Sequence, residues 1–271
     1  MATLINKIYC ENCLETMAKM PDAFIDLTVT SPPYDNLRTY NGYDFHFEPI
    51  AKELFRITKK GGVVVWVVGD ATINGSETGT SFKQALYFKE IGFNLHDTMI
   101  YQKNGPSYPA NDSSVRYSQV FEYMFVMSKD MPHVVNLIKD KANKWAGAKT
   151  FGKQSHRGKD GNRINKGNKR TIQDIGYRYN IWKINNGHGY GSKDEIVFNH
   201  PASFPEKLAR DHIYTWSNEG DLVYDPFMGS GTTAKAAHSL NRNWIGSEIS
   251  SEYVELANKR LKKYLTQTKL F

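Results

Sequence analysis

The stretch "LVYDPFMGSGTTAKAA" (residues 222–237) passes from an apolar run through a glycine-rich turn into a pattern typical of a helix. Gly229 and Gly231 allow the backbone to turn tightly and to approach a ligand, and the helix that follows offers free N–H groups at its start. It is not a Walker loop, because no lysine precedes Thr232, and it lacks the third glycine of the dinucleotide fingerprint. The stretch predicts a strand, a ligand-binding turn and a helix; the alternative is a tight turn capped by a threonine.

An acidic residue, Glu248, stands seventeen positions after Gly231, at the end of the next apolar run. An acid at the tip of the second strand can accept two hydrogen bonds from ribose hydroxyls. The glycine turn and Glu248 together predict a nucleoside cofactor. Asp225, at the tip of the first strand, either holds the amides of the turn or faces a cationic part of that cofactor.

The alternation of strand and helix patterns extends in both directions from this unit. Strands are predicted for 24–30, 61–70, 94–103, 120–129, 221–227 and 243–249. Helices are predicted for 47–60, 81–92, 229–241 and 252–265, an entry turn and a helix for 200–216, and polar loops for 72–81 and 105–114. The cations and glycines of 59–62 are typical of the end of a helix. The pattern predicts a parallel α/β sheet covered by helices on both faces.

The formal charge of +7, with a pI near 9.1, is concentrated in one insert. Residues 139–193 hold 14 lysines and arginines against three aspartates, a balance of +11. Aromatic residues are interleaved with these charges, namely Trp145, Phe151, Tyr177, Tyr179, Trp182 and Tyr190. A purely solvating loop is poor in aromatics, whereas basic and aromatic groups together bind phosphates and bases. We therefore expect the insert to contact nucleic acid, through Lys153, Arg157, Arg163, Lys169, Arg170 and Arg178.

Length and composition exclude several classes of protein. A chain of 271 residues can bury a sizeable core, no run of about 18 apolar residues occurs, and the first 25 residues lack the pattern of a leader. Its two cysteines, Cys10 and Cys13, have zinc-like spacing, but a structural zinc site needs four ligands. We expect a cytoplasmic protein with buried thiols, no membrane segment and no metal.

A second short stretch, "TVTSPPYDNLRTY" (28–40), ends a predicted strand in a rigid turn. Pro32 and Pro33 fix φ and remove two backbone donors, so the carbonyl groups are presented without competing amides. The Ser31 hydroxyl and the Pro32 carbonyl can accept the two N–H bonds of an amino group while Tyr34 stacks on its ring. The turn is therefore suited to hold a flat base that bears an NH2 group, taken out of the duplex.

With both motifs in place, the chain resembles the β group of the S-adenosylmethionine (AdoMet)-dependent DNA amino-methyltransferases. "TSPPY" comes first, the basic region follows, and "DPFMGSGTT" comes last; "YCENCLETM", "GGVVVWVVGDA", "VFEYMFVMSK" and "HPASFPEKL" are also similar. The resemblance covers roughly 1–128 and 200–271. It implies a Rossmann-like AdoMet-dependent methyltransferase sheet with helices on both faces, built from 1–129 and 200–271, with 130–199 as the inserted target-recognition region for double-stranded DNA.

The resemblance also implies roles for individual residues. The base-binding and catalytic set is Ser31, Pro32, Pro33 and Tyr34. The AdoMet-binding set is Cys13, Phe204, Pro205, Asp225, Pro226, Phe227, Gly229, Ser230, Gly231, Thr232, Thr233 and Glu248. Asn12 stands where the family usually has aspartate, and Phe204 where many members have lysine. The segment 35–47 either closes over the extruded base, with Arg38 on the DNA, or is an ordinary connection that packs its aromatic residues.

The chemistry follows from these groups. The methyl group of AdoMet is already electrophilic, so Ser31 needs to orient the amine rather than to take its proton. A carbon-5 cytosine methyltransferase would need a nucleophilic cysteine in its catalytic loop, and the Pro-Pro turn has none. Methylation of RNA or of a protein amide is the second reading, and a non-catalytic DNA-binding module the third.

The target base is the least determined feature. Ser31 at the first motif position favours, by resemblance, N4 of cytosine over N6 of adenine. The recognition sequence, a cognate restriction nuclease in a restriction-modification pair, and the choice between monomer and homodimer stay open.

Overall fold

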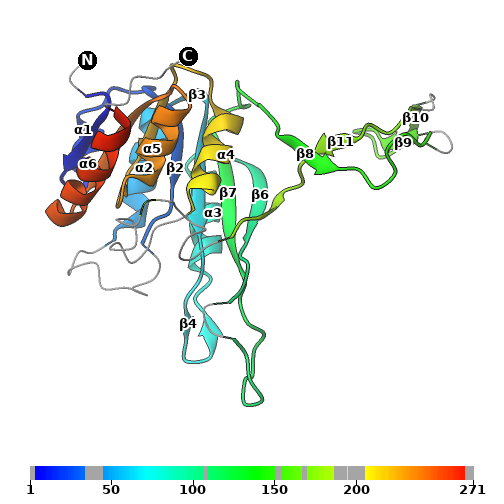
Figure 1. Cartoon of the computed structure of the whole chain (residues 1–271), viewed down its shortest axis with the longest axis horizontal. Coiled ribbons are helices and arrows are strands. Elements are labelled where there is room, and N and C mark those ends of the chain that lie inside the picture. Colours follow the sequence, from blue (N-terminus) through cyan, green and yellow to red (C-terminus); the bar gives the residue numbers. More distant parts are fainter. Residues whose placement is uncertain are drawn as a thin grey trace. The chain divides into compact units, whose positions relative to one another are not determined.

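The valine-rich strand β3 (Thr58–Val68) lies near the middle of an eight-stranded sheet in the computed structural model (Figure 1). The structure describes residues 4–33, 45–106, 109–150, 154–166, 170–185, 194 and 205–265. The strand order is β1 (Lys7–Cys10), β14 (Asn243–Glu248), β13 (Leu222–Asp225), β2 (Ile25–Thr30), β3, β7 (Phe121–Ser128), β6 (Asn94–Gln102) and β12 (Ile181–Lys183). The chain divides into two compact units, Met1–Asn136 with Asn180–Phe271, and Leu137–Tyr179.

The sheet is parallel except at one strand. β1, β14, β13, β2 and β3 pair in parallel, and β12 pairs in parallel with β6, whereas β7 is antiparallel to both β3 and β6. The prediction of an entirely parallel sheet is therefore wrong at β7. The chain passes from β6 to β7 through a polar loop instead of a crossover helix, and a direct return of this kind produces an antiparallel pair.

Six helices in the described part of the chain cover the sheet in two rows. They are α1 (Cys13–Ala18), α2 (Phe47–Ile57), α3 (Thr80–Glu90), α4 (Glu206–Trp216), α5 (Thr232–Ser239) and α6 (Ser251–Leu265). α1, α2 and α3 neighbour one another, as do α4, α5 and α6. The predicted α/β class, with helices on both faces, is confirmed.

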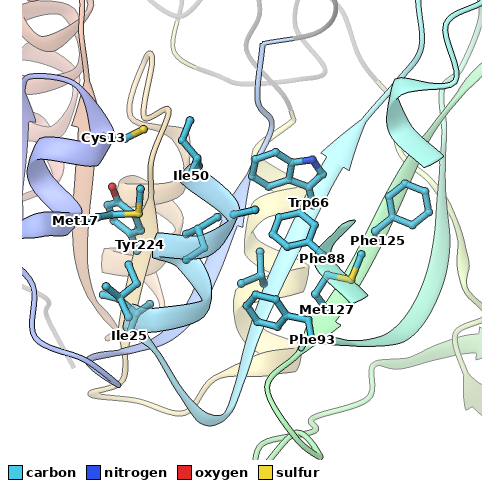
Figure 2. Close-up of a cluster of buried hydrophobic side chains, with 14 of the residues drawn as sticks. Cys13, Met17, Ile25, Ile50, Trp66, Phe88, Phe93, Phe125, Met127 and Tyr224 are labelled. Atoms are coloured by element: carbon cyan, nitrogen blue, oxygen red, sulfur yellow. The ribbon is translucent and has the colours of Figure 1, made fainter. Parts of the chain in front are cut away.

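Alternate residues of the central strands supply the two cores. Val64, Trp66 and Val68 join Tyr224 and side chains of α1–α3 in one cluster, part of which Figure 2 shows. The intervening valines of β3 are also buried and pair with Leu27 and Val29, on the face where α4 and α5 pack. A strand that is buried on both faces explains the unbroken apolar run in the sequence.

Two local boundaries differ from the sequence prediction. α2 ends at Ile57, and Lys59 and Lys60 belong to β3, where Lys59 Nζ lies 2.8 Å from the Asp26 carboxylate. The predicted loop 72–81 contains a small hairpin, β4 (Thr72–Ile73) with β5 (Ser76–Glu77), turning at an Asn-Gly pair. Asn74 and Gly75 both have positive φ, 49° and 76°, as a type I′ turn requires.

The second unit, 137–179, is a two-stranded antiparallel ribbon that we call the arm. Near its base β8 (Lys139–Ala142) pairs with β11 (Ile175–Tyr177), and further along β9 (Gln154–Arg157) pairs with β10 (Arg163–Lys166). A bridge between Lys149 and Thr171 lies between these ladders. The arm, 137–179, spans fewer residues than the predicted insert, 130–199. Part of that range, β12, pairs with β6 in the main sheet instead.

Candidate functional site

The strands that precede the two motifs are direct neighbours. β2 and β13 pair in parallel, with Tyr224 opposite Thr28, so their carboxyl ends lie at the same edge. From β2 the chain moves to β3 on one side, and from β13 it moves to β14 on the other. Ligands of open α/β sheets bind at the carboxyl edge where the strand order reverses in this way. The two motifs therefore meet at the expected ligand-binding position of the sheet.

A hydrogen bond joins the two strand tips. The Thr30 hydroxyl donates to Asp225 Oδ1 over 2.6 Å, and Asp225 Oδ2 accepts from the Thr233 hydroxyl at 2.7 Å. The Phe227 amide donates to Oδ1 at 3.0 Å. Burial raises the pKa of Asp225 to about 6, while these hydrogen bonds act in the opposite direction. Of the two roles open for Asp225, the geometry favours the first, in which it holds the turn.

The glycine turn follows directly and is anchored to β14. Gly229 and Gly231 have φ of 49° and 80°, in the left-handed region that favours glycine. The Met228 amide donates to the Ser247 carbonyl at 2.8 Å. A Cβ on Gly246 would overlap Met228 Cε and lie 2.9 Å from Met228 Cγ, so any larger residue at 246 would require the Met228 side chain in the turn to shift. The sequence reasoning missed Gly246, and no local pattern could have revealed it because its neighbour comes from another segment of the chain.

Glu248 lies beside the turn at the end of β14. Its Oε2 accepts from the Gly229 amide at 2.8 Å, and its Oε1 accepts from the Ser250 amide at 2.9 Å. Burial raises the pKa of Glu248, and the amides of Ser250, Gly229 and Ile249 counteract part of that effect. Each carboxylate oxygen has a second lone pair, so both can still accept from a ligand hydroxyl.

The start of α5 completes the group. Gly231 is the N-cap, and within the described residues no side chain caps this end of the helix. Thr232, Thr233 and Ser230 are buried around it, as are Pro226 and Gly229. Helix amides without a protein partner suit a carboxylate, and Glu248 suits a pair of hydroxyls. AdoMet carries both kinds of group, so the residues present fit this cofactor.

The remaining predicted AdoMet residues take other positions. Cys13 lies on α1 within the hydrophobic cluster, where burial raises the pKa of its thiol to about 12. Cys10 is exposed, so the prediction of buried thiols is wrong for this residue. Asn12, the departure from the family pattern, caps α1 by accepting from the Leu14 amide at 2.9 Å. Pro205 is buried and forms the N-cap of α4. Phe204 lies outside the described residues.

The base-binding turn is described as far as its second proline. Ser31 and Pro33 are partly buried and Pro32 is buried, immediately after the Thr30 anchor. Tyr34 and Arg38 lie outside the described residues. The ring of Phe227 lies 5.7 Å from that of Phe45. Phe45, near the end of the 35–47 segment, therefore packs its ring against other aromatic residues, as expected if the segment is an ordinary connection.

The arm carries the cations that were expected to contact nucleic acid. Within 137–179 there are 12 lysines and arginines against three aspartates, a balance of +9. Arg157 and Arg163 are exposed and stand directly opposite each other in the β9–β10 ladder. Arg170 is also exposed, whereas Lys153 and Lys169 lie outside the described residues. Two like charges in directly paired positions repel each other, which an anionic partner would relieve.

Arg178 differs from the other arginines. Its guanidinium binds the Asp140 carboxylate through Nε and Nη2, and its side chain is only 15% exposed. Three lysines that the prediction did not single out lie over aromatic rings of the arm. The ammonium groups of Lys139, Lys141 and Lys144 are 5.1, 4.1 and 5.4 Å from the ring centres of Tyr177, Tyr179 and Trp145, respectively.

A doubly covered α/β sheet whose reversal point joins a glycine turn to a Ser-Pro-Pro turn defines the class of AdoMet-dependent methyltransferases. Comparison with known sequences makes the assignment narrower. The chain belongs to the N6/N4 amino-methyltransferase family, whose model, described as DNA methylase, matches residues 25–259. It is therefore an AdoMet-dependent DNA methyltransferase, as the two motifs predicted. No helix in the described part of the chain has the length and apolar character to cross a membrane.

Individual relatives agree with this family. The chain is 59% identical to the orphan methyltransferase M.BamHII of Bacillus amyloliquefaciens over 244 residues, which cover 90% of this chain and 91% of that protein. Its fold is similar to that of PvuII DNA methyltransferase (cytosine-N4-specific), with a TM-score of 0.68, 21% identity and coverage of 98% and 87% of the two chains. TTHA0409 of Thermus thermophilus, solved with S-adenosyl-L-methionine, has a TM-score of 0.64 at 22% identity, with coverage of 97% and 95%.

Proposed function

We propose that this enzyme methylates N4 of cytosine in double-stranded DNA, on a base turned out of the duplex. The observation that carries the proposal is the bond between Thr30 and Asp225, which places the Ser-Pro-Pro turn beside the glycine turn. Ser31 at the first position of the base-binding motif favours cytosine. N6 of adenine presents the same two N–H donors and is the alternative product.

The residues of the chain account for the reaction as follows. When bound, AdoMet supplies an electrophilic methyl group. Ser31 Oγ and the Pro32 carbonyl accept the two N–H bonds of the amine, and the Tyr34 ring stacks on the base. The nitrogen forms the new N–C bond as the sulfur–methyl bond breaks, which would leave a neutral thioether as the leaving group. The amine becomes cationic as the new bond forms, so both acceptors stabilise the transition state more than the ground state. The methylated amine then loses a proton to water.

The glycine turn, Glu248 and the start of α5 hold the cofactor in this proposal. Glu248 accepts from the ribose hydroxyls, and the first amides of α5 receive the carboxylate. Asp225 acts behind the turn by holding the Phe227 amide and the two threonine hydroxyls. The fixed prolines keep the acceptors in place, so little has to be reorganised when the base arrives.

The target base can be tested directly. DNA from cells that express the protein would be digested to nucleosides and analysed by mass spectrometry, and sequenced for modified bases. We expect N4-methylcytosine at one sequence context, and none from cells that express Ser31→Ala. N6-methyladenine in place of N4-methylcytosine would overturn the assignment of the base.

The arm is proposed to bind the DNA backbone through its exposed arginines, Arg157, Arg163 and Arg170, with Lys153 and Lys169 as further contacts. Arg38, in the main unit, is proposed as a separate DNA contact. Its balance of +9 supports this role. Arg178 is left out because Asp140 neutralises it. Each phosphate contact that is lost should reduce the slope of log affinity against log salt by about 1. Arg163→Gln should show this reduction, whereas Arg178→Gln, the matched control, should keep the original slope.

A further inference from the structure

A partly buried ionic network, centred on the buried side chain of Arg260, lies behind the glycine turn. Arg260 and Lys235 each bind both Asp194 and Glu206, with distances of 2.9 and 2.5 Å for Arg260 and 2.7 and 2.8 Å for Lys235. The Tyr264 hydroxyl donates to Asp194 Oδ1 at 2.5 Å. The side chain of Arg260 is 1% exposed and that of Asp194 is 8% exposed. The network joins α5, α6, the start of α4 and the chain between β12 and α4.

Arg260 also reaches the turn itself. Its Nη1 donates to the Ser230 carbonyl at 2.9 Å and to the Thr232 hydroxyl at 3.1 Å. The same helix, α6, packs against the turn, since a Cβ on Gly231 would lie 3.2 Å from Ala257 Cβ. One guanidinium therefore holds two successive parts of the turn that we assign to AdoMet, while its other nitrogens are fixed by two carboxylates.

Stability alone does not require this arrangement. Burying the Arg260 guanidinium and partly burying its carboxylate partners costs free energy, and a well-packed apolar cluster is often as stable as a buried ion pair. The network instead provides a defined geometry, because a planar guanidinium with several donors holds its hydrogen-bond partners in fixed relative positions. Arg260 bonds Asp194, Glu206 and Ser230 through three different nitrogens, Nε, Nη2 and Nη1, whereas a lysine has all its donors on one nitrogen.

We propose that Arg260 is a positioning residue for methyl transfer, which sets the Ser230–Thr232 backbone in the shape that receives AdoMet. Asp194 and Glu206 hold its guanidinium in place, and they connect the turn to the chain that follows β12 and to the first turn of α4. This inference rests on the proposed assignment of the glycine turn and Glu248 to the cofactor.

The experiment compares three variants of the full-length protein by calorimetric titration with AdoMet, thermal unfolding and steady-state kinetics. Arg260→Lys keeps the positive charge but loses the planar guanidinium with donors on three nitrogens. Arg56→Lys is the matched control, because Arg56 also donates to two carbonyls, those of Met17 and Met20, and to two carboxylates, but on α2. Glu248→Gln removes a proposed cofactor contact directly.

For Arg260→Lys we expect the Kd and KM for AdoMet to rise by at least about tenfold, the cost of a lost charged hydrogen bond, with the KM for DNA unchanged. Arg56→Lys should lower the unfolding temperature and leave the Kd within about twofold of the original. If Arg260→Lys does not fold, Asp194→Asn takes its place and should raise the Kd in the same direction.

Three results would overturn the inference. An unchanged Kd in Arg260→Lys beside a raised Kd in Glu248→Gln would remove the positioning role while the cofactor assignment stands. An unchanged Kd in both variants would remove the cofactor assignment as well. An equal loss of affinity in Arg56→Lys would show that general loosening of the fold, and not the Arg260 contact, lowers the affinity.

Discussion

Asp225 is a carboxyl group that the fold places entirely out of solvent at the centre of the site. Burial raises its pKa from 3.8 to about 6, so between about pH 4 and pH 6 the folded protein holds a proton that the unfolded chain has lost. The stability contributed by this group is therefore full below about pH 4 and declines as pH rises through about 6, by about 3 kcal/mol in total.

The comparison with Asp225→Asn tests this dependence, because the amide cannot ionise. Urea unfolding of both proteins between pH 4 and pH 7 at fixed ionic strength should give a difference in unfolding free energy that grows with pH in favour of the variant. A difference that stays constant over this range would mean that Asp225 titrates normally in the folded state.

Gly246 is the residue on which the packing of the turn against β14 depends. A methyl group there would overlap Met228 Cε and lie 3.0 Å from its Cβ, so Gly246→Ala should displace the turn and cost about 1–3 kcal/mol of stability. We expect AdoMet affinity in Gly246→Ala to fall about tenfold in calorimetric titration. The double variant with Met228→Ala should recover part of the affinity, and no recovery would contradict a steric cause.

At the scale of the elements, the strands β2 and β13 must stay in register at their carboxyl ends for the base and the methyl group to meet. Backbone pairing sets that register, and the Thr30 hydroxyl bond to Asp225 links the two strand ends beyond it. Thr30→Val should therefore lower kcat about tenfold, the cost of a lost hydrogen bond to a charged group, with a smaller effect on AdoMet affinity.

Thr28→Val provides the control on the same strand. Thr28 is fully buried, and its hydroxyl has no hydrogen-bond partner among the described residues. Replacing it by valine should leave kcat unchanged and stability equal or higher. Steady-state kinetics with a duplex substrate would measure both variants, and an equal fall in kcat for both would show that any change in β2 is harmful.

The elements that could be predicted from the sequence are those with a complete local pattern. β2 alternates apolar residues with Asp26, Thr28 and Thr30, β13 and β14 contain short apolar runs, and the turn beside them has its own glycines. The start of β3 could not be predicted, because Lys59 enters the strand to meet Asp26, a partner 33 residues away. The direction of β7 likewise depends on long-range pairing that no local pattern encodes. The role of Arg260 could not be predicted either, because its partners Asp194 and Glu206 lie 66 and 54 residues away in the sequence.

At the scale of the whole molecule, the arm is joined to the main unit by two residues that are held within that unit. The Asn136 amide donates to the Thr215 carbonyl at 2.8 Å, and the Asn180 carbonyl accepts from the Ile100 amide at 2.8 Å. The main unit has its own buried cores and does not depend on the arm for them. The positive charge of this region could be predicted from the sequence. The antiparallel ribbon could not, because it depends on pairing between β8 and β11 and between β9 and β10.

Replacing 138–178 by a short glycine-serine linker should therefore leave a folded protein that binds AdoMet with a Kd within about threefold of the original. Its affinity for duplex DNA should fall by at least about a hundredfold, because the whole +9 balance of the arm is removed. Calorimetry with AdoMet and fluorescence anisotropy with labelled duplex, over a range of salt, would measure the two properties separately. A shortened protein that retains both its DNA affinity and its salt slope would place the DNA-binding surface on the main unit, and the arm would then need another role.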